Sequence, residues 1–112
     1  MEPIQTHPFK IDVQPRESRC VVRLVGELDM AAVPGCNEAL HSVQHQGFSE
    51  VVIDLRGLTF LDSMGLSALL QAHLAGQDGH KPVSFVRGNQ TVHRVFQLTK
   101  TDDQLDWIDP PE

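Results

Sequence analysis

The sequence predicts an α/β fold: a mixed sheet of four to five strands that opens with an N-terminal β-hairpin and carries about three helices. Two observations predict it. Two-residue apolar alternation near the N-terminus indicates paired strands. Further on, apolar β-type runs alternate with segments of helical periodicity, the pattern of parallel crossovers. With 112 residues, 40% of them apolar and 21% charged, the chain is expected to form one domain, 1–112, with its core at about 9–108.

The expected hairpin comes first. Residues 9–13 alternate apolar and polar side chains, as a half-buried strand does. A turn candidate at 15–18 separates them from residues 20–25, which are apolar apart from Arg23 and indicate a more buried strand. The segment 26–29 is expected to leave that strand.

The first helix and a central strand follow. The helix is expected to begin near Pro34, whose fixed φ suits a first turn, and to end near Gly47. Its apolar positions recur at helical spacing at Val33, Cys36, Leu40 and Val43. Residues 51–55 are apolar on both faces apart from an aspartate, which predicts a strand buried on both sides. Residues 56–62 are expected to form a loop.

The C-terminal half continues the alternation. A second helix is expected from Ser63 to Ala75, with Gly76 as its stop signal. Its predicted apolar stripe is Leu66, Leu69, Leu70 and Leu74. A strand is expected at 83–86, and a third helix begins near Asn89, a suitable N-cap. The third stripe is Val92, Val95, Phe96 and Leu98. Residues 105–108 are expected to add a last strand, which Pro110 and Pro111 stop.

Composition excludes several function classes. The formal net charge of −6 argues against nucleic acid as a partner, because phosphate-backbone binding needs a basic face. No segment approaches the roughly 20 apolar residues of a membrane span, and residues 1–10 lack the apolar stretch of a signal peptide. Cys20 and Cys36 match no metal or redox spacing. They are expected to be buried reduced thiols of a cytoplasmic protein, with one disulfide as the alternative.

Ser63 stands where a buried strand delivers the chain into a helix. Backbone N–H groups at a helix start lack intrahelical partners and carry a partial positive charge. A serine there can be the N-cap. Alternatively, Asp62 is the cap and Ser63 occupies the first helical position and points outward. Gly65 in the first turn is costly for a helix, and is easier to explain if something approaches the backbone closely.

Other chemistry has weaker support in the residues. The carboxylates of Glu27, Asp29, Asp54 and Asp62 could suggest paired acids for hydrolysis, but an acidic rim for docking is the better interpretation. A catalytic Ser63 would need an oriented histidine, and none of the six (His7, His41, His45, His73, His80 and His93) lies in such a motif. His41 and His45 have two-ligand metal spacing without a third ligand, so a solvated helix face is preferred. No glycine-rich phosphate motif is present, so no cofactor is expected.

The segments 26–29 (GELD), Pro34 and 54–66 (DLRGLTFLDSMGL) together resemble the STAS domain of bacterial anti-sigma factor antagonists. The resemblance extends from about Phe9 to Ile108. It implies a partner-switching protein with no enzymatic activity. The unphosphorylated form binds an anti-sigma factor, often a serine kinase, which later phosphorylates the serine after the aspartate; a phosphatase reverses the change.

Carried over to this sequence, the phosphorylated residue is Ser63. The partner-binding residues are then expected to be Glu27, Asp29, Asp62, Ser63, Met64, Gly65 and Leu66. Met64 stands where family members often have a second serine, which puts the identity of the partner in doubt. The alternative is an adapter role without phosphorylation, as a subunit of a lipid-transport ABC system or a stress-signalling complex.

Overall fold

A computed structural model describes residues 9–79 and 81–111. The N-terminal residues to which the signal-peptide expectation applies lie largely outside these ranges, as do His7 and His80. Within them, one five-stranded sheet has the order β1-β2-β3-β4-β5. The strands β1 (Lys10–Arg16) and β2 (Arg19–Leu28) form the expected antiparallel hairpin. The remaining neighbours, β3 (Glu50–Leu61), β4 (Val83–Val86) and β5 (Asp106–Ile108), pair in parallel.

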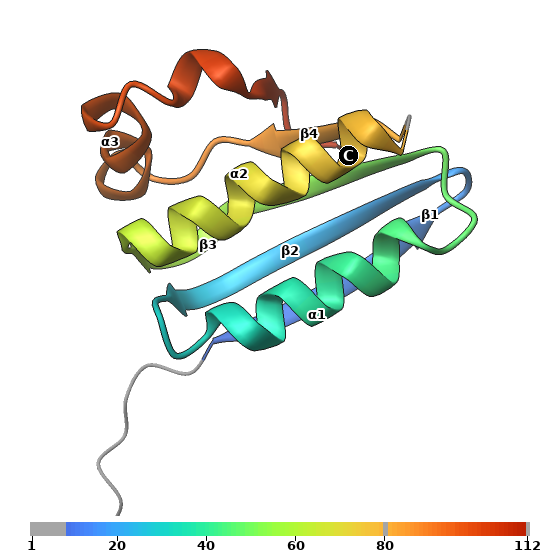
Figure 1. The fold of residues 1–112 in the computed structure, drawn as a ribbon, viewed down its shortest axis with the longest axis horizontal. Coiled ribbons are helices and arrows are strands. Elements are labelled where there is room, and N and C mark those ends of the chain that lie inside the picture. The colour runs from blue at the N-terminus through green and yellow to red at the C-terminus, as the bar shows by residue number, and fades with distance from the viewer. Residues whose placement is uncertain (1–8, 80, 112) are drawn as a thin grey trace, which may run out of the picture.

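Three helices provide the crossovers: α1 (Val33–Gln44), α2 (Ser63–Asp78) and α3 (Gln90–Leu98). The helices α1 and α2 lie side by side across one face of the sheet, and α3 lies beyond α2 (Figure 1). A single 3-10 turn, Asp102–Gln104, leads into β5. The predicted mixed α/β architecture with an N-terminal hairpin is therefore confirmed.

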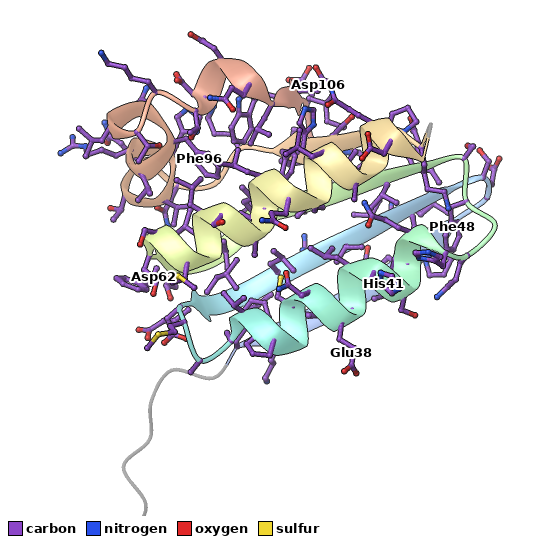
Figure 2. All side chains as sticks on the ribbon, viewed as in Figure 1. Glu38, His41, Phe48, Asp62, Phe96 and Asp106 are labelled. Atoms are coloured by element: carbon purple, nitrogen blue, oxygen red, sulfur yellow. The ribbon has the colours of Figure 1, made fainter. Side chains whose placement is uncertain are left out.

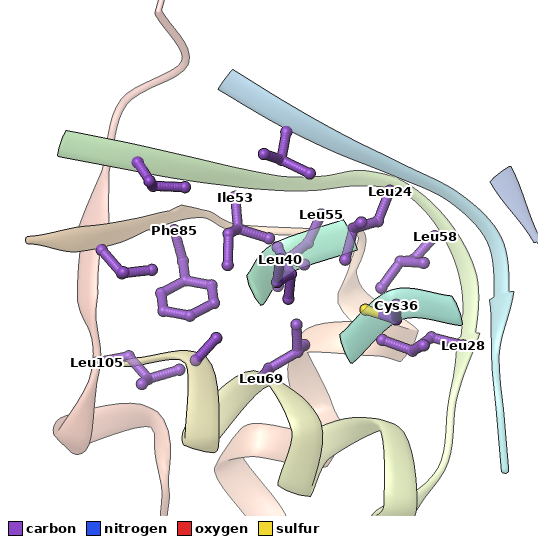
Figure 3. Packing of buried hydrophobic residues seen from close by; sticks show 14 of the residues in the cluster. Leu24, Leu28, Cys36, Leu40, Ile53, Leu55, Leu58, Leu69, Phe85 and Leu105 are labelled. Atoms are coloured by element: carbon purple, nitrogen blue, oxygen red, sulfur yellow. The ribbon is translucent and has the colours of Figure 1, made fainter. Parts of the chain in front are cut away.

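The main core lies between the sheet and these helices. Leu24, Ile53 and Phe85 come from three neighbouring strands and face Leu40 of α1 and Leu69 of α2 (Figure 3). All five are almost fully buried. The expected thiols also belong to this core, since Cys20 and Cys36 are buried and free of any disulfide. Burial raises the pKa of both thiols, that of Cys36 to about 11.

The strands β2 and β3 are longer than the sequence predicts. The expected loop at 56–62 is wrong, because β3 continues to Leu61 and pairs with a β2 that itself runs to Leu28. Two register shifts in this ladder absorb the irregular sequence around Gly57. At Gly57 an added Cβ would lie 2.8 Å from the Leu24 carbonyl oxygen. That glycine therefore allows close strand contact and does not mark a turn.

Two helix predictions also need correction. Gly76 does not stop α2, which continues to Asp78. An added Cβ at Gly76 would lie 2.5 Å from Val83 Cγ2, so glycine is needed there for helix–strand packing. The predicted apolar stripes are also wrong at one position in each helix, because Leu74 of α2 is 56% exposed and Leu98 of α3 is 76% exposed. Trp107, by contrast, packs against Phe85 and Phe96 as a rim contact of the core.

Candidate functional site

The candidate site lies at the edge of the sheet where β2 and β3 end and where α1 and α2 begin (Figure 1). This arrangement follows from the parallel pairing of the two strands, because each crossover helix must start at the carboxyl end of the strand before it. We call this region the carboxyl edge and define it by residues 27–34 and 60–66. It contains every residue that the sequence nominated for partner binding.

Asp62 holds the carboxyl edge together. Its Oδ1 accepts a hydrogen bond from the Gly65 backbone N–H at 2.8 Å, and its Oδ2 accepts one from the Met30 N–H at 3.0 Å. Its own backbone N–H donates to the Leu28 carbonyl at 3.3 Å. Asp62 is thus the N-cap of α2 and also fixes the loop that leaves β2 (Figure 2). Of the two alternatives for the cap, the one with Ser63 as N-cap is wrong.

Ser63 therefore does not cap α2. It is the first helical residue of α2, and its side chain is exposed. Among the described residues, its hydroxyl makes no hydrogen bond. Met64 beside it is 49% exposed. A serine in this position is open to a modifying enzyme without any unfolding of the helix.

Gly65 and Leu66 lie beneath this surface. Both are buried, and Leu66 belongs to the main core. A Cβ at position 65 would lie 2.4 Å from the Leu28 carbonyl oxygen. The close approach that explains this glycine is therefore made by the end of β2 within the same chain. Gly65 and Leu66 can influence a partner only by holding Ser63 and Met64 in place.

The two acids after β2 have different surroundings. The Asp29 Oδ1 accepts the Ala32 N–H at 3.0 Å, and the Asp29 carbonyl accepts the N–H groups of Ala32 and Val33. Asp29 thereby shapes the turn into α1. Glu27 is half-buried on β2 and pairs in register with Phe60 of β3.

The structure adds two residues that sequence reasoning missed. Met30 is 67% exposed and Phe60 is 44% exposed, and both belong to the carboxyl edge. Phe60 was overlooked because its segment was interpreted as a loop. Met30 carries no signal in the sequence beyond being an apolar residue next to an acidic turn. Exposed apolar side chains beside a charged rim are typical of protein–protein contact surfaces.

The carboxyl edge is acidic as well as apolar. The stretches 24–40 and 57–72 contain Glu27, Asp29, Glu38 and Asp62 but no lysine, arginine or histidine. Asp54, the other acid considered for this region, lies eight residues before Asp62 along β3, roughly 26 Å away. It pairs with arginines on the opposite face of the sheet and does not join the rim.

None of the described histidines (41, 45, 73 and 93) makes a hydrogen bond to Ser63. His41 on α1 and His45, the C-cap residue just after it, are both exposed, and the His45 Nδ1 lies 2.9 Å from the His41 carbonyl oxygen, which agrees with a solvated helix face. In the part of the chain that the structure describes, no three histidine, cysteine or acidic side chains are grouped as metal ligands would be. Among those same residues, no helix is both long and apolar enough to cross a membrane.

The chain matches a known protein family and is similar to several proteins and solved structures. The family model described as "STAS domain" matches residues 10–111. The anti-sigma-B factor antagonist of Staphylococcus aureus is 26% identical over 84 residues, which is 75% of this chain and 78% of that protein. Among solved structures, an anti-sigma factor antagonist from Mycobacterium paratuberculosis superposes with a TM-score of 0.81 at 26% identity, covering 93% of this chain and 87% of that one. The anti-sigma factor antagonist SpoIIAA in its unphosphorylated form shares the fold, with a TM-score of 0.73 at 24% identity over 94% of this chain and 90% of that one.

Proposed function

This chain belongs to the STAS domain family, and we propose that it is an anti-sigma factor antagonist whose binding is controlled by phosphorylation of Ser63. In this role it is a cytoplasmic binding module without chemistry of its own. Its partners are an anti-sigma factor that is itself a serine kinase, and a phosphatase that restores the free hydroxyl.

The observation that carries the proposal is that Asp62 caps α2 while Ser63, the next residue, is exposed. The aspartate accepts the capping hydrogen bond of α2 from the Gly65 N–H and a second bond from the Met30 N–H, whereas the serine hydroxyl next to it is exposed and unbonded among the described residues. A phosphate can be added there or removed without loss of the cap. The fold then stays the same, and only the charge of the surface changes.

The surroundings of Ser63 explain why a phosphate would oppose binding. It adds between one and a half and two negative charges, by the usual second pKa of about 6. No basic residue stands in segments 24–40 or 57–72 to pair with it, and carboxylates are already present. Set about 4 Å from a carboxylate of the partner, each added charge costs up to about 4 kcal/mol at a surface-like dielectric. A quarter of that value lowers affinity about fivefold.

Charge variants at Ser63 test the switch. The cognate anti-sigma factor should bind wild-type protein and Ser63→Ala with similar affinity, and should bind Ser63→Glu at least about tenfold more weakly. The matched control is Ser67→Glu, which places the same charge one helical turn further along the exposed face of α2. Equal affinity for all four proteins would contradict the proposal.

Phosphate transfer itself separates the switch from an adapter role. Incubation with the cognate kinase and ATP should raise the intact mass by one phosphate, and fragment masses should place it on Ser63. The Ser63→Ala variant should gain none. A wild-type protein that binds the anti-sigma factor but is never phosphorylated would instead support a scaffold that does not switch.

A further inference from the structure

The face of the sheet away from α1 and α2 has its own composition. Its floor is a second apolar cluster, formed by Val21, Val52 and Val86 with the half-buried Ile108 packed against it. These residues come from four adjacent strands, β2 to β5. None of the interpretations of the sequence assigned a role to this face. We call it the open face.

A buried carboxylate organises the arginines around this floor. Asp54 is 1% exposed, and its two oxygens accept hydrogen bonds from Arg56 Nε at 3.0 Å and Arg56 Nη2 at 2.8 Å. Arg23 Nε lies 3.6 Å from the same carboxylate. Burial alone would raise the pKa of Asp54, but hydrogen bonds and charge from Arg56, together with Arg23, lower it overall. One anionic carboxylate therefore holds two guanidinium groups at the surface.

Two hollows flank Arg56 on the open face. One, of about 340 Å³, is lined by Arg56, Arg87, Trp107 and the chain from Ile108 to Pro110. The other, of about 320 Å³, includes Arg16, Arg23 and Asp54 in its lining. Each is of the size that small ligands occupy in proteins.

The charge of this lining is opposite to that of the protein. Four arginines (16, 23, 56 and 87) face two carboxylates, those of Asp54 and Asp109, which leaves a net charge of +2. The whole chain has a formal charge of −6. Guanidinium groups whose orientation is already fixed bind phosphate and carboxylate oxygens well, because little side-chain freedom remains to be lost.

A cation–aromatic contact lies at the border of the first hollow. Arg87 and Trp107 both contribute to its lining, and the Arg87 guanidinium lies 5.9 Å from the centre of the Trp107 ring. The ring itself packs on Phe85 and Phe96 on the helix side of the sheet, and its Nε1 donates a hydrogen bond to the Asp102 carbonyl at 2.8 Å. A ligand in this hollow would meet cationic groups beside apolar surface from Val86 and Ile108.

We propose that the open face binds a small organic anion, with its phosphate or carboxylate group held by Arg56 and Arg87 and its apolar ring placed against Val86 and Ile108. The site is distinct from the carboxyl edge, because Asp54 and Ser63 lie on different faces and far apart along the same strand–helix unit. Failure of one proposal therefore leaves the other standing.

Calorimetric titration of the full chain with phenyl phosphate, at constant ionic strength, tests the site. Phenyl phosphate should bind saturably and should change the fluorescence of Trp107, the single tryptophan of the chain. Benzoate distinguishes carboxylate from phosphate as the preferred anion, and inorganic phosphate measures the contribution of the ring. Inorganic phosphate should bind more weakly than phenyl phosphate, because it lacks the ring. Benzoate should compete with phenyl phosphate for the same site.

Two arginine variants provide the matched comparison. Arg87→Gln should weaken binding of phenyl phosphate at least about fivefold, whereas Arg94→Gln, on the exposed side of α3 and outside both hollows, should leave it unchanged. No saturable binding by wild-type protein at millimolar concentrations would overturn the proposal. Equal losses in the two variants would overturn it as well, since they would indicate a general charge effect.

Discussion

At the residue scale, the carboxyl edge depends on two neighbouring side chains that do different things. Asp62 fixes backbone, because its oxygens bind the N–H groups of Gly65 and Met30. Ser63 contributes nothing comparable to the fold and remains exposed. This asymmetry allows a modification site to stand directly beside a structural cap. It also makes the two residues separable by mutation.

Replacing Asp62 by alanine should therefore destabilise the protein by about 1–3 kcal/mol, through loss of the cap and of the bond to the Met30 N–H. Ser63→Ala should change stability by less than about 0.5 kcal/mol. Urea unfolding followed by circular dichroism measures both. A larger loss for Ser63→Ala than for Asp62→Ala would mean that the serine is the cap after all.

His93 provides a pH-dependent contribution to stability. It is 6% exposed, contacts the Trp107 ring edge-on at 4.9 Å between centroids, and its Nδ1 has no hydrogen-bond partner among the described residues. Burial and the nearby Arg87 lower its pKa, and Asp102 partly opposes them. The unfolded chain therefore binds a proton at this position before the folded chain does.

Stability should accordingly fall as the pH drops below about 6.5, the ordinary pKa of histidine, and should level off below the folded pKa. Urea unfolding at pH 7.5 and pH 5.5 measures the difference, and a His93→Gln variant should show a smaller one. The prediction fails if wild-type protein is equally stable or more stable at the lower pH while the variant behaves identically.

At the scale of elements, much of the fold could be predicted from pattern alone. The strand at 51–55 and the helix begun by Asn89 follow from β-branched runs and from N-cap chemistry, and both are present. Local sequence misled where tertiary pairing decides. Residues 56–61 contain a glycine and polar residues, as a turn does, yet they form a strand because β2 extends beside them.

The same reasoning applies to the candidate site. Asp62 and Ser63 could be located from sequence, because a strand, an acidic cap and a helix follow one another directly. The bond that makes Asp62 the cap is local, from the Gly65 N–H, but its second bond, from the Met30 N–H, joins residues 32 positions apart, and no local pattern predicts it. Phe60 was hidden for the same reason as the end of β3. The open face brings together residues from five strands and the C-terminal segment, so only the fold reveals it.

Glycines at the helix starts test how tightly α2 is seated on β2. Gly65→Ala should cost about 1–3 kcal/mol, because the new Cβ would lie 2.4 Å from the Leu28 carbonyl oxygen. Gly35→Ala in α1 is the matched control, since nothing lies within 4 Å of its Cβ position. That change should stabilise the protein by up to about 1 kcal/mol. Equal effects on the midpoint of urea unfolding would contradict the packing described.

At the scale of the whole molecule, one core joins the sheet to α1 and α2, and two cysteines report on it. Cys20 and Cys36 are both 0% exposed. Their raised pKa values also keep them as neutral thiols near pH 7. Neither position can react with a thiol reagent unless the core opens.

Labelling by an aromatic disulfide reagent should therefore follow global unfolding. The free energy obtained from the labelling rates of both thiols should agree with that from urea unfolding. Fast labelling of Cys36 alone would show that α1 opens separately from the sheet.

In the proposed function, the carboxyl edge changes charge when Ser63 is phosphorylated, while the fold stays the same. The most direct test is the affinity of one protein preparation for its anti-sigma factor, measured before and after stoichiometric phosphorylation of Ser63. We expect the dissociation constant to rise at least about tenfold while the circular dichroism spectrum and unfolding midpoint stay nearly the same. An unchanged dissociation constant, or a loss of binding that accompanies unfolding of α2, would contradict the account.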